Sequence, residues 1–291
     1  MINTRQLNHF ARVAKLGNFT HAAKSLHIAQ PALSISIKKF EQQLGIILFK
    51  REERHISLTE EGRVLYQYAQ TILRQLDDAQ LAVDEMKGLM KGEVRLGAPS
   101  MMGAYFFPQV VTAFRKQYPN LKISIVDAGI QSVRQMLLDG ELDIGVILDK
   151  DIPSSLDTEP LFSSQMVAVV SNNHVLAAKK SINFKTFLAH ELIIFKSGYF
   201  HRDLIDRICE EQKIEPNIAY ETNLLPMILN LVKNEQAISV LLKLVADNER
   251  GVTAVPFSPP VDINLALAWR KNAYLSYADR AFIEFTKQYI S

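Results

Sequence analysis

A short segment near the start of the chain carries side chains suited to reading a nucleic acid. Residues 30–44 read as a helix that opens on Gln30-Pro31, where the missing N–H of proline costs nothing, and that ends at Gly45. Four apolar residues of this helix follow one another at steps of four, three and four positions, which places them on one face, against a small core: Leu33, Ile37, Phe40 and Leu44. The opposite face suits phosphates, base edges and, through isoleucine, a thymine methyl group; it holds Gln30, Pro31, Ser34, Ile35 and Lys38.

Neighbouring segments would position this helix. Residues 21–26 form a short helical run after the helix-start signal Asn18-Phe19-Thr20, with Thr20 placed as its cap, and a turn at residues 27–29 joins the two helices. Residues 5–16 supply an earlier helix, and residues 49–58 read as a hairpin with a basic tip. Together they predict a winged helix-turn-helix. The alternative is that residues 30–44 form an ordinary amphipathic surface helix.

Positive charge is gathered in the same part of the chain. Residues 1–63 contain ten Lys or Arg and five Asp or Glu, a balance of +5, so the rest of this +2 chain carries −3. A basic segment is attracted to the phosphate backbone and releases counterions on binding, whereas an acidic remainder stays off it. The charge pattern therefore predicts double-stranded DNA as the partner of the N-terminal segment.

A long helix after the hairpin predicts a dimer. Thr59 is placed to cap it, and Glu60 and Glu61 lie at the positive end of its dipole. Apolar residues then alternate steps of four and three over more than three repeats: Leu65, Ala69, Ile72, Leu76, Ala79, Val83, Met86 and Met90. Polar residues lie on both sides of this apolar stripe, which favours a seam between two copies of the chain. The alternative is that the stripe packs on its own chain. Such a dimer needs a two-fold-related DNA site.

A second domain is expected from about residue 93. Strands at residues 93–98, 121–126 and 142–147, with helices at 104–117 and 131–139 between them, indicate a parallel α/β sheet. A second set follows, with strands at 165–170, 192–195, 218–221 and 237–241 and helices at 202–212 and 225–234. Residues 265–269 read as one more strand and 276–289 as a helix. This pattern predicts two lobes.

Ligands of two-lobed sheets bind in the cleft, at strand carboxyl ends and helix starts. Three segments fit that description, at residues 98–101, 196–201 and 221–223, and residues 131–132 would lie at the rim of the cleft. The candidate ligand contacts in these segments are Ser100, Met101, Gln131, Ser132, Lys196, Ser197, Tyr199, Phe200, His201 and Thr222. Two helix starts and Lys196 would favour a small carboxylate or other anion. Plain alternatives stay open: the serines as helix caps, the aromatic rings as packing, and His201 as a solvated loop residue.

Several motifs match a known family. Phe19-Thr20-His21-Ala22-Ala23, Gln30-Pro31-Ala32-Leu33-Ser34, Phe40-Glu41, Leu44-Gly45, Leu48-Phe49 and Leu58-Thr59-Glu60-Glu61-Gly62 together resemble the N-terminal signature of LysR-type transcriptional regulators. The family's chain length and domain order fit all 291 residues. The resemblance implies a DNA-binding domain at residues 1–58, a dimerisation linker helix and hinge at 59–92, and an effector-binding domain at 93–291. That domain would be periplasmic-binding-protein-like, with lobe I at about 93–155 and 257–291 and lobe II at about 156–256.

The resemblance also implies roles and partners. Gln30, Pro31, Ser34 and Lys38 would lie nearest bases and phosphates, Thr20 and Ile35 beside them, and Arg51 and Arg54 would reach DNA from the wing. The expected partners are an interrupted palindrome in DNA, a small-molecule effector, a second copy in a dimer or dimer of dimers, and RNA polymerase if the protein is an activator. Effector binding would change lobe closure and so DNA bending.

Two positions depart from the family pattern. Ile35 and Ser36 stand where a long polar or basic side chain often follows the serine of the recognition helix. Residues 232–238 lack the usual glycines, and Asn234 is expected to take the left-handed helix end in their place.

Other classes of protein find no support in the sequence. It contains no G-x-S-x-G, P-loop or G-x-G-x-x-G motif, and its seven histidines show no close metal-ligand spacing, so neither an enzyme nor a cofactor is expected. Cys209 is the single cysteine, which excludes an intramolecular disulfide and favours a buried structural residue. No signal peptide or long apolar run is seen, which predicts a cytoplasmic bacterial protein without membrane contact. Two alternatives remain: a two-lobed solute-binding or enzymatic domain tethered by its head, and an architectural DNA-bridging protein.

Overall fold

The computed structural model describes residues 2–52, 55–87 and 92–290, without the side chains of Arg51, Glu52 and His55. The chain divides into two compact units, an N-terminal unit of residues 1–89 and a C-terminal unit of residues 90–291. Each unit has its own hydrophobic core.

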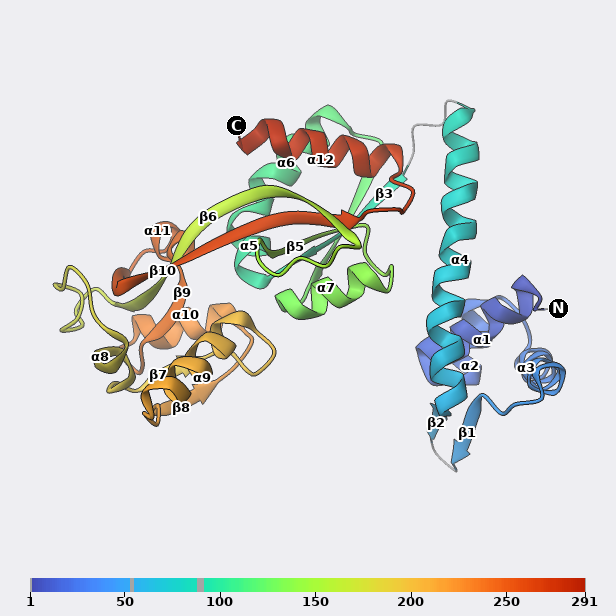
Figure 1. The fold of residues 1–291 in the computed structure, drawn as a ribbon, viewed down its shortest axis with the longest axis horizontal. Coiled ribbons are helices and arrows are strands. Elements are labelled where there is room, and N and C mark those ends of the chain that lie inside the picture. Colours follow the sequence, from blue (N-terminus) through green and yellow to red (C-terminus); the bar gives the residue numbers. More distant parts are fainter. Residues whose placement is uncertain (1, 53–54, 88–91, 291) are drawn as a thin grey trace. The chain divides into compact units, whose positions relative to one another are not determined.

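The N-terminal unit is a winged helix-turn-helix that runs into a long helix (Figure 1). Its elements are α1 (Thr4–Leu16), α2 (Phe19–Ser25), α3 (Gln30–Leu44), the antiparallel pair β1 (Phe49–Glu52) and β2 (His55–Leu58), and α4 (Glu60–Met86). Phe10 lies at the centre of the core, with ring centroids 5.4 Å from Phe49 and 6.1 Å from Phe40. Aromatic rings from three elements thus fix the angle of α3 against α1 and the wing.

Caps set the helix boundaries, and one expected cap was wrong. Asn18, not Thr20, caps α2, because the Asn18 side chain accepts from the His21 N–H at 3.0 Å in an extended conformation. Thr20 lies inside the first turn and is exposed. Thr59 caps α4 as expected, accepting from the Gly62 N–H at 2.9 Å.

Gly62 is required by close packing at the start of α4. A Cβ at this position would lie 2.2 Å from the carbonyl oxygen of Leu48 and 3.1 Å from the Leu58 side chain. The glycine in the Leu58–Gly62 motif therefore lets α4 lie directly on the chain that enters the wing.

The C-terminal unit is built on one mixed sheet of six strands, ordered β4-β3-β5-β10-β6-β9. The strands are β3 (Gly92–Ala98), β4 (Leu121–Asp127), β5 (Ile144–Leu148), β6 (Leu156–Ser171), β9 (Ser239–Leu242) and β10 (Val252–Arg270). The expected parallel sheet holds only for β3, β4 and β5; β10 is antiparallel to both β5 and β6, and β6 to β9. β10 lies between β5 and β6 and is antiparallel to both, so β5 and β6 run in the same direction on its two sides.

Helices cover both faces of the lobe I part of this sheet (Figure 1). The helices are α5 (Ser100–Tyr105), α6 (Phe107–Gln117), α7 (Ile130–Leu138) and α12 (Tyr277–Ile290). α6 and α12 pack on one face and α7 on the other, where its core is a separate cluster. The single helix expected at 104–117 is two, because Pro108 falls in the first turn of α6, where a proline is best tolerated.

Lobe II surrounds a second, two-stranded parallel sheet. It contains α8 (Phe184–Leu188), β7 (Leu192–Ile194), α9 (Phe200–Gln212), β8 (Ile218–Glu221), α10 (Leu225–Lys233) and α11 (Lys243–Asn248). α8 and α11 were not predicted. The expected left-handed Asn234 was also wrong: Asn234 has φ −88°, and Glu235 takes φ 60°, with its carboxylate accepting from the Asn173 side chain.

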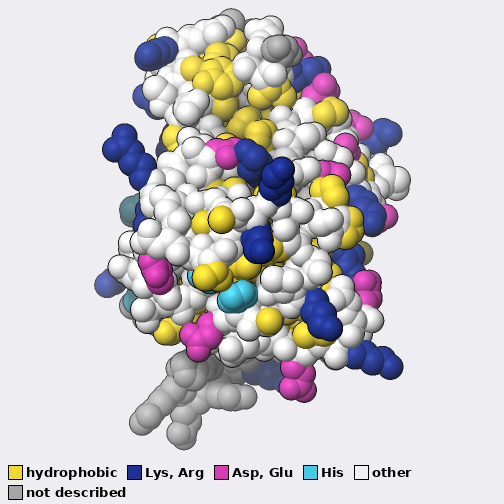
Figure 2. Space-filling view, turned by 90° about the vertical axis from the view of Figure 1, so that its left-hand side faces the viewer, with side chains coloured by type: hydrophobic (Ala, Val, Ile, Leu, Met, Phe, Trp, Pro, Cys, Tyr) yellow, Lys and Arg dark blue, Asp and Glu magenta, His cyan; other side chains and the backbone are white. Residues whose placement is uncertain are grey.

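Two long strands join the lobes. β6 has 16 residues and β10 has 19, and they pair antiparallel along their length (Figure 1). β6 runs from lobe I into lobe II, and β10 returns the chain to lobe I. Residues 261–265 of β10 and Met166 of β6 line spaces between the lobes. Figure 2 shows the side of the C-terminal unit that carries α8, where basic and acidic side chains are interspersed. This mixture contrasts with the net charge of +5 on residues 1–63.

Candidate DNA-binding helix and inter-lobe cleft

The outward face of α3 is as the sequence predicted. Leu33, Ile37 and Phe40 are fully buried, whereas Ile35 keeps 56% of its surface exposed. The remaining predicted contacts on α3 (Gln30, Pro31, Ser34 and Lys38) are exposed or half-buried. A helix with one buried stripe and an opposite face of polar groups around one isoleucine can contact both phosphates and base edges.

Hydrogen bonds order two of the serines on α3. The Gln30 side chain donates to the Ser34 hydroxyl at 2.9 Å, so these two polar groups act as one unit on the outward face. Ser36 instead bonds His9 Nδ1 of α1 at 2.8 Å. Burial, with a smaller effect of Arg5, lowers the pKa of His9, so this contact is made by a neutral imidazole. Ser36 thus links α3 to α1 and is not part of the outward face. On that face, the exposed Ile35 is the apolar residue beside Ser34.

The wing is described in part. Arg51 belongs to β1, but its side chain lies outside the described residues, and so does the whole of Arg54. Their expected contacts with DNA stay predictions.

The long helix α4 divides its apolar residues between two faces. Ala69 is fully buried in the core of the N-terminal unit, so its own chain covers it. Leu65 packs against this core but is only partly buried, and its place in an intermolecular seam stays a prediction. The heptad spacing identified the apolar residues of α4 but could not tell whether the same chain or a second copy covers them. Ile72, Leu76, Val83 and Met86 are 39, 46, 45 and 86% exposed, and Ala79 is also exposed. Tyr68, at 65% exposed, continues this face by one step of four and was missed.

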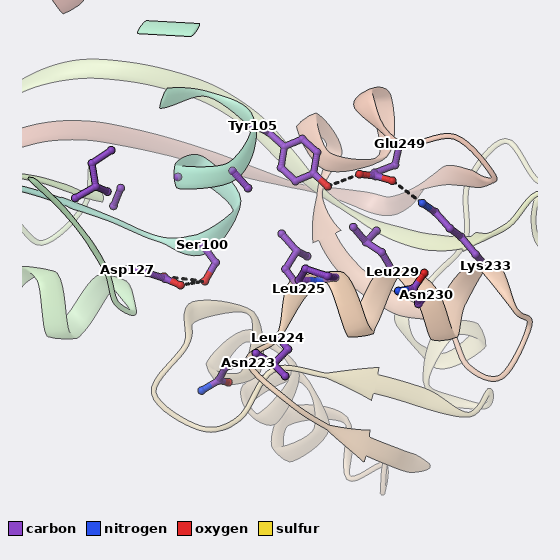
Figure 3. A pocket seen from close by; sticks show the side chains of 15 residues that line it. Ser100, Tyr105, Asp127, Asn223, Leu224, Leu225, Leu229, Asn230, Lys233 and Glu249 are labelled. Carbon is purple, nitrogen blue, oxygen red and sulfur yellow. Dashed lines mark hydrogen bonds and ion pairs between the residues drawn. The ribbon is translucent and has the colours of Figure 1, made fainter. Parts of the chain in front are cut away.

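A cavity of about 670 Å³ lies between α5 of lobe I and α10 of lobe II (Figure 3). At one end the Ser100 hydroxyl contacts both Asp127 carboxylate oxygens, at 2.8 and 3.0 Å. Leu224, Leu225 and Leu229 form an apolar wall on the α10 side. Pro99 is the N-cap residue of α5, so Ser100 is not the cap that the alternative interpretation supposed.

The other end of this cavity is closed by a chain of polar contacts between the lobes. Tyr105 of α5 donates to Glu249 Oε1 at 2.6 Å, and Lys233 of α10 contacts Glu249 Oε2 at 2.6 Å (Figure 3). The hydrogen bond from Lys233, followed by that from Tyr105, lowers the pKa of Glu249. Burial, and then Glu249, raise the pKa of Tyr105. Glu249 is therefore ionised and Tyr105 protonated at neutral pH, which holds α5 against α10 and α11.

A second cavity, of about 580 Å³, lies between α7 and α9 and contains the predicted residues Gln131 and Phe200. Its lining has three basic side chains (Arg134, Lys150, Arg207) and four acidic ones (Asp149, Asp151, Asp203, Asp262). Neither sign of charge dominates this space.

A third, small space of about 20 Å³ contains Phe200 again and three more of the predicted residues: Met101, Tyr199 and His201. The ring of His201 stacks on Phe195, with centroids 4.7 Å apart, and burial lowers the pKa of His201 to about 3. The imidazole is thus neutral at physiological pH, and it is not a solvated loop histidine. Burial, and then Asp127, raise the pKa of Tyr199.

Four predicted residues line none of these three spaces: Ser132, Lys196, Ser197 and Thr222. Ser132, Lys196 and Ser197 are exposed, and the Thr222 hydroxyl accepts from the Leu224 N–H at 3.1 Å. Tyr199 is the N-cap residue of α9, so Ser197 is not a helix cap either.

Sequence reasoning missed several cleft residues. Asp127 ends β4 and Asp149 follows β5, so the rule that ligands gather at the carboxyl ends of parallel strands could have found both. Tyr105 and Glu249 are 144 residues apart, and no local pattern joins them.

The backbones of the two lobes also come close together at two glycines. A Cβ on Gly129 of lobe I would lie 2.5 Å from the carbonyl oxygen of Gly198 in lobe II. Gly198 itself has φ 90°, a backbone conformation that favours glycine. Only a residue without a side chain allows this close approach of the two backbones.

The described residues offer little support for a reactive thiol, a metal site or a membrane-spanning helix. Cys209 is buried, and burial, with a smaller effect of Asp206, raises the pKa of its thiol, so its thiolate fraction is small. Residues 2–52, 55–87 and 92–290 contain no cluster of three or more His, Cys, Asp or Glu that could hold a metal ion. Among the helices described, none combines the length and apolar character needed to cross a membrane.

Comparison with known proteins agrees with this arrangement. Residues 4–63 match the family described as bacterial regulatory helix-turn-helix protein, lysR family, and residues 87–291 match the LysR substrate binding domain. The chain is 34% identical to the uncharacterized HTH-type transcriptional regulator YwbI of Bacillus subtilis (strain 168), over 99% of this chain and 97% of that protein.

Solved structures show the same fold. Full-length CbnR, described in complex with its target DNA, aligns over 99% of both chains with a TM-score of 0.69 and 21% identity. The effector binding domain of QuiR, in complex with shikimate, aligns over 68% of this chain and 97% of its own, with a TM-score of 0.59 and 27% identity.

A winged helix-turn-helix followed by a two-lobed α/β unit defines a DNA-binding transcriptional regulator with an effector-binding domain, and not an enzyme. The chain belongs to the LysR family of transcriptional regulators.

Proposed function

We propose that α3 reads base edges in the major groove of a two-fold-related DNA site, and that a small molecule between the lobes controls this binding. The outward face of α3 carries the proposal, because Ile35 is exposed beside the bonded pair Gln30 and Ser34 and near Lys38. Thr20 on α2 and the wing residues Arg51 and Arg54 would add contacts to the backbone.

The exposed stripe of α4 supports a dimer. Ile72, Leu76, Ala79, Val83 and Met86 follow steps of four, three, four and three, as in a coiled-coil seam. A second copy of the chain has the same stripe and can cover it by two-fold symmetry. Two heads related in this way would bind an interrupted palindrome.

The effector is proposed to bind between the lobes. The cavities of about 670 and 580 Å³ are within the range of small-molecule sites, and the QuiR domain is described with a small molecule bound. Binding that favours one degree of lobe closure would shift how the C-terminal units associate, and so the spacing of the heads and the bending of DNA.

Assembly and location complete the proposal. Two dimers would form a tetramer on DNA, an activator would also contact RNA polymerase, and the protein would act in the cytoplasm, where bacterial DNA lies.

Selection of genomic fragments by the purified protein at ~150 mM salt tests this function, because nonspecific phosphate binding is weak there. We expect a shared two-fold motif. Recovery of fragments without a motif would contradict sequence-specific regulation and favour an architectural DNA-bridging protein. A small molecule that raises the unfolding temperature and alters binding to the motif would support control by an effector.

A further inference from the structure

One small space in the inter-lobe cleft is lined almost entirely by apolar side chains. The space of about 20 Å³ is closed by residues of lobe I, of the bridging strands and of lobe II, and three of them are methionines: Met101, Met102 and Met166. Ile263 and Leu265 of β10 complete its floor. Methionine side chains change conformation easily and contact aromatic rings well, so this space can widen around an apolar group.

One polar atom in this region lacks a partner. Nδ1 of His201 is buried and makes no hydrogen bond within the described part of the chain. A buried polar group without a partner is unfavourable, so a ligand that offers a hydrogen bond here gains more than it would from a solvated group. Because burial lowers the pKa of His201 to about 3, the imidazole is uncharged and supplies no attraction for an anion.

The apolar space continues into a larger one. Ile130, Phe200 and Ile263 line both it and the cavity of about 580 Å³ between α7 and α9. A ligand can therefore place its body in the larger cavity and its apolar end among the methionines. The charges in the larger cavity are mixed, and the cation expected for an anion, Lys196, is exposed and lines neither space.

We infer that the effector is an uncharged molecule with an apolar ring or chain, which enters between Met101, Met166 and Phe200 and carries one hydroxyl or carbonyl group for His201. This inference rests on the proposed effector site and names its ligand class. An ion at this place would lose its water without gaining a partner of opposite charge, which costs far more than burying a neutral group. The anion expected from the sequence thus has less support than a neutral ligand.

Four probes that share one ring and one carbon arm test the ligand class with the full-length protein at about pH 7: benzyl alcohol, toluene, benzoate and benzylammonium. Dissociation constants come from ligand-observed NMR titrations. We expect benzyl alcohol to bind at least about tenfold tighter than either ion. It should also bind about 2- to 10-fold tighter than toluene, because of the hydrogen bond to His201.

Two variants locate the binding. Ile130→Glu puts a carboxylate at the junction of the two spaces and should abolish binding of benzyl alcohol and toluene. Leu138→Glu, the same kind of change on α7 outside the cavities, should leave both unchanged. His201→Phe keeps an aromatic ring and should remove the advantage of benzyl alcohol over toluene.

Tighter binding of benzoate or benzylammonium would overturn the inference, and so would failure of all four probes to bind at millimolar concentration. Equal effects of Ile130→Glu and Leu138→Glu would also overturn it. Selection of a DNA motif needs no probe, so the proposed DNA-binding function can stand when this inference fails.

Discussion

Truncation of one leucine on α4 gives a sharp test of the dimer seam. Leu76 is 46% exposed in the described chain. Burying a whole leucine side chain stabilises by about 1.5–3 kcal/mol, so covering this fraction contributes about 0.7–1.4 kcal/mol per chain. A two-fold seam holds two copies, and Leu76→Ala should therefore cost about 1.4–2.8 kcal/mol, or about 10- to 100-fold in the dimer dissociation constant. Alanine keeps the Cβ methyl group, so we expect the lower end of this range.

Sedimentation velocity of the full-length protein over a range of concentrations measures this constant. Leu138→Ala is the matched control, because Leu138 on α7 is 36% exposed and loses the same atoms. We expect weaker dimerisation for Leu76→Ala and wild-type behaviour for Leu138→Ala. Equal dissociation constants for wild type and Leu76→Ala would refute the assignment of this stripe to the dimer.

Three further predictions concern charge, packing and pH. Lys38→Ala should weaken binding to all DNA sequences and lower the slope of log K against log salt by about one; an unchanged slope would remove Lys38 from the phosphates. Gly62→Ala should destabilise the N-terminal unit by about 1–3 kcal/mol, because the added Cβ meets the Leu48 carbonyl oxygen, and a wild-type denaturation midpoint would show that the contact yields without strain. Burial, and then Asp143, raise the pKa of Asp279 from 3.8 to about 7. Ionisation of Asp279 then opposes folding, so stability should fall as pH rises from about 4 through 7. Asp279→Asn should reduce this fall in denaturant titrations, and an equally steep fall in the variant would assign it to other groups.

Local patterns in the sequence predicted the N-terminal unit well. The stripe Leu33, Ile37 and Phe40 needs only helical periodicity, and a helix start and end mark α3 on both sides. Periodicity does not say which surface covers a stripe, however. Ala69 follows the same heptad pattern as Leu76 but is buried within its own chain.

The long strands and the cleft were harder to predict. Only the C-terminal parts of β6 and β10 were found, because the rest of each strand is more exposed and contains prolines such as Pro160 and Pro256. The cleft is made by contacts over long sequence separations, such as Tyr105 with Glu249. Local reasoning places residues at helix starts but cannot tell that the Ser100 hydroxyl bonds Asp127, or that Nδ1 of His201 is buried.

Base reading by the outward face of α3 is tested most directly by comparing the DNA motifs selected by wild type and by the double variant Ser34→Ala/Ile35→Ala. Ile47→Ala is the control, since Ile47 is 67% exposed in the loop that follows α3. We expect a two-fold motif from wild type and control, and loss of preference at symmetric positions in each half for the double variant. The same motif from all three proteins would contradict base reading by this face.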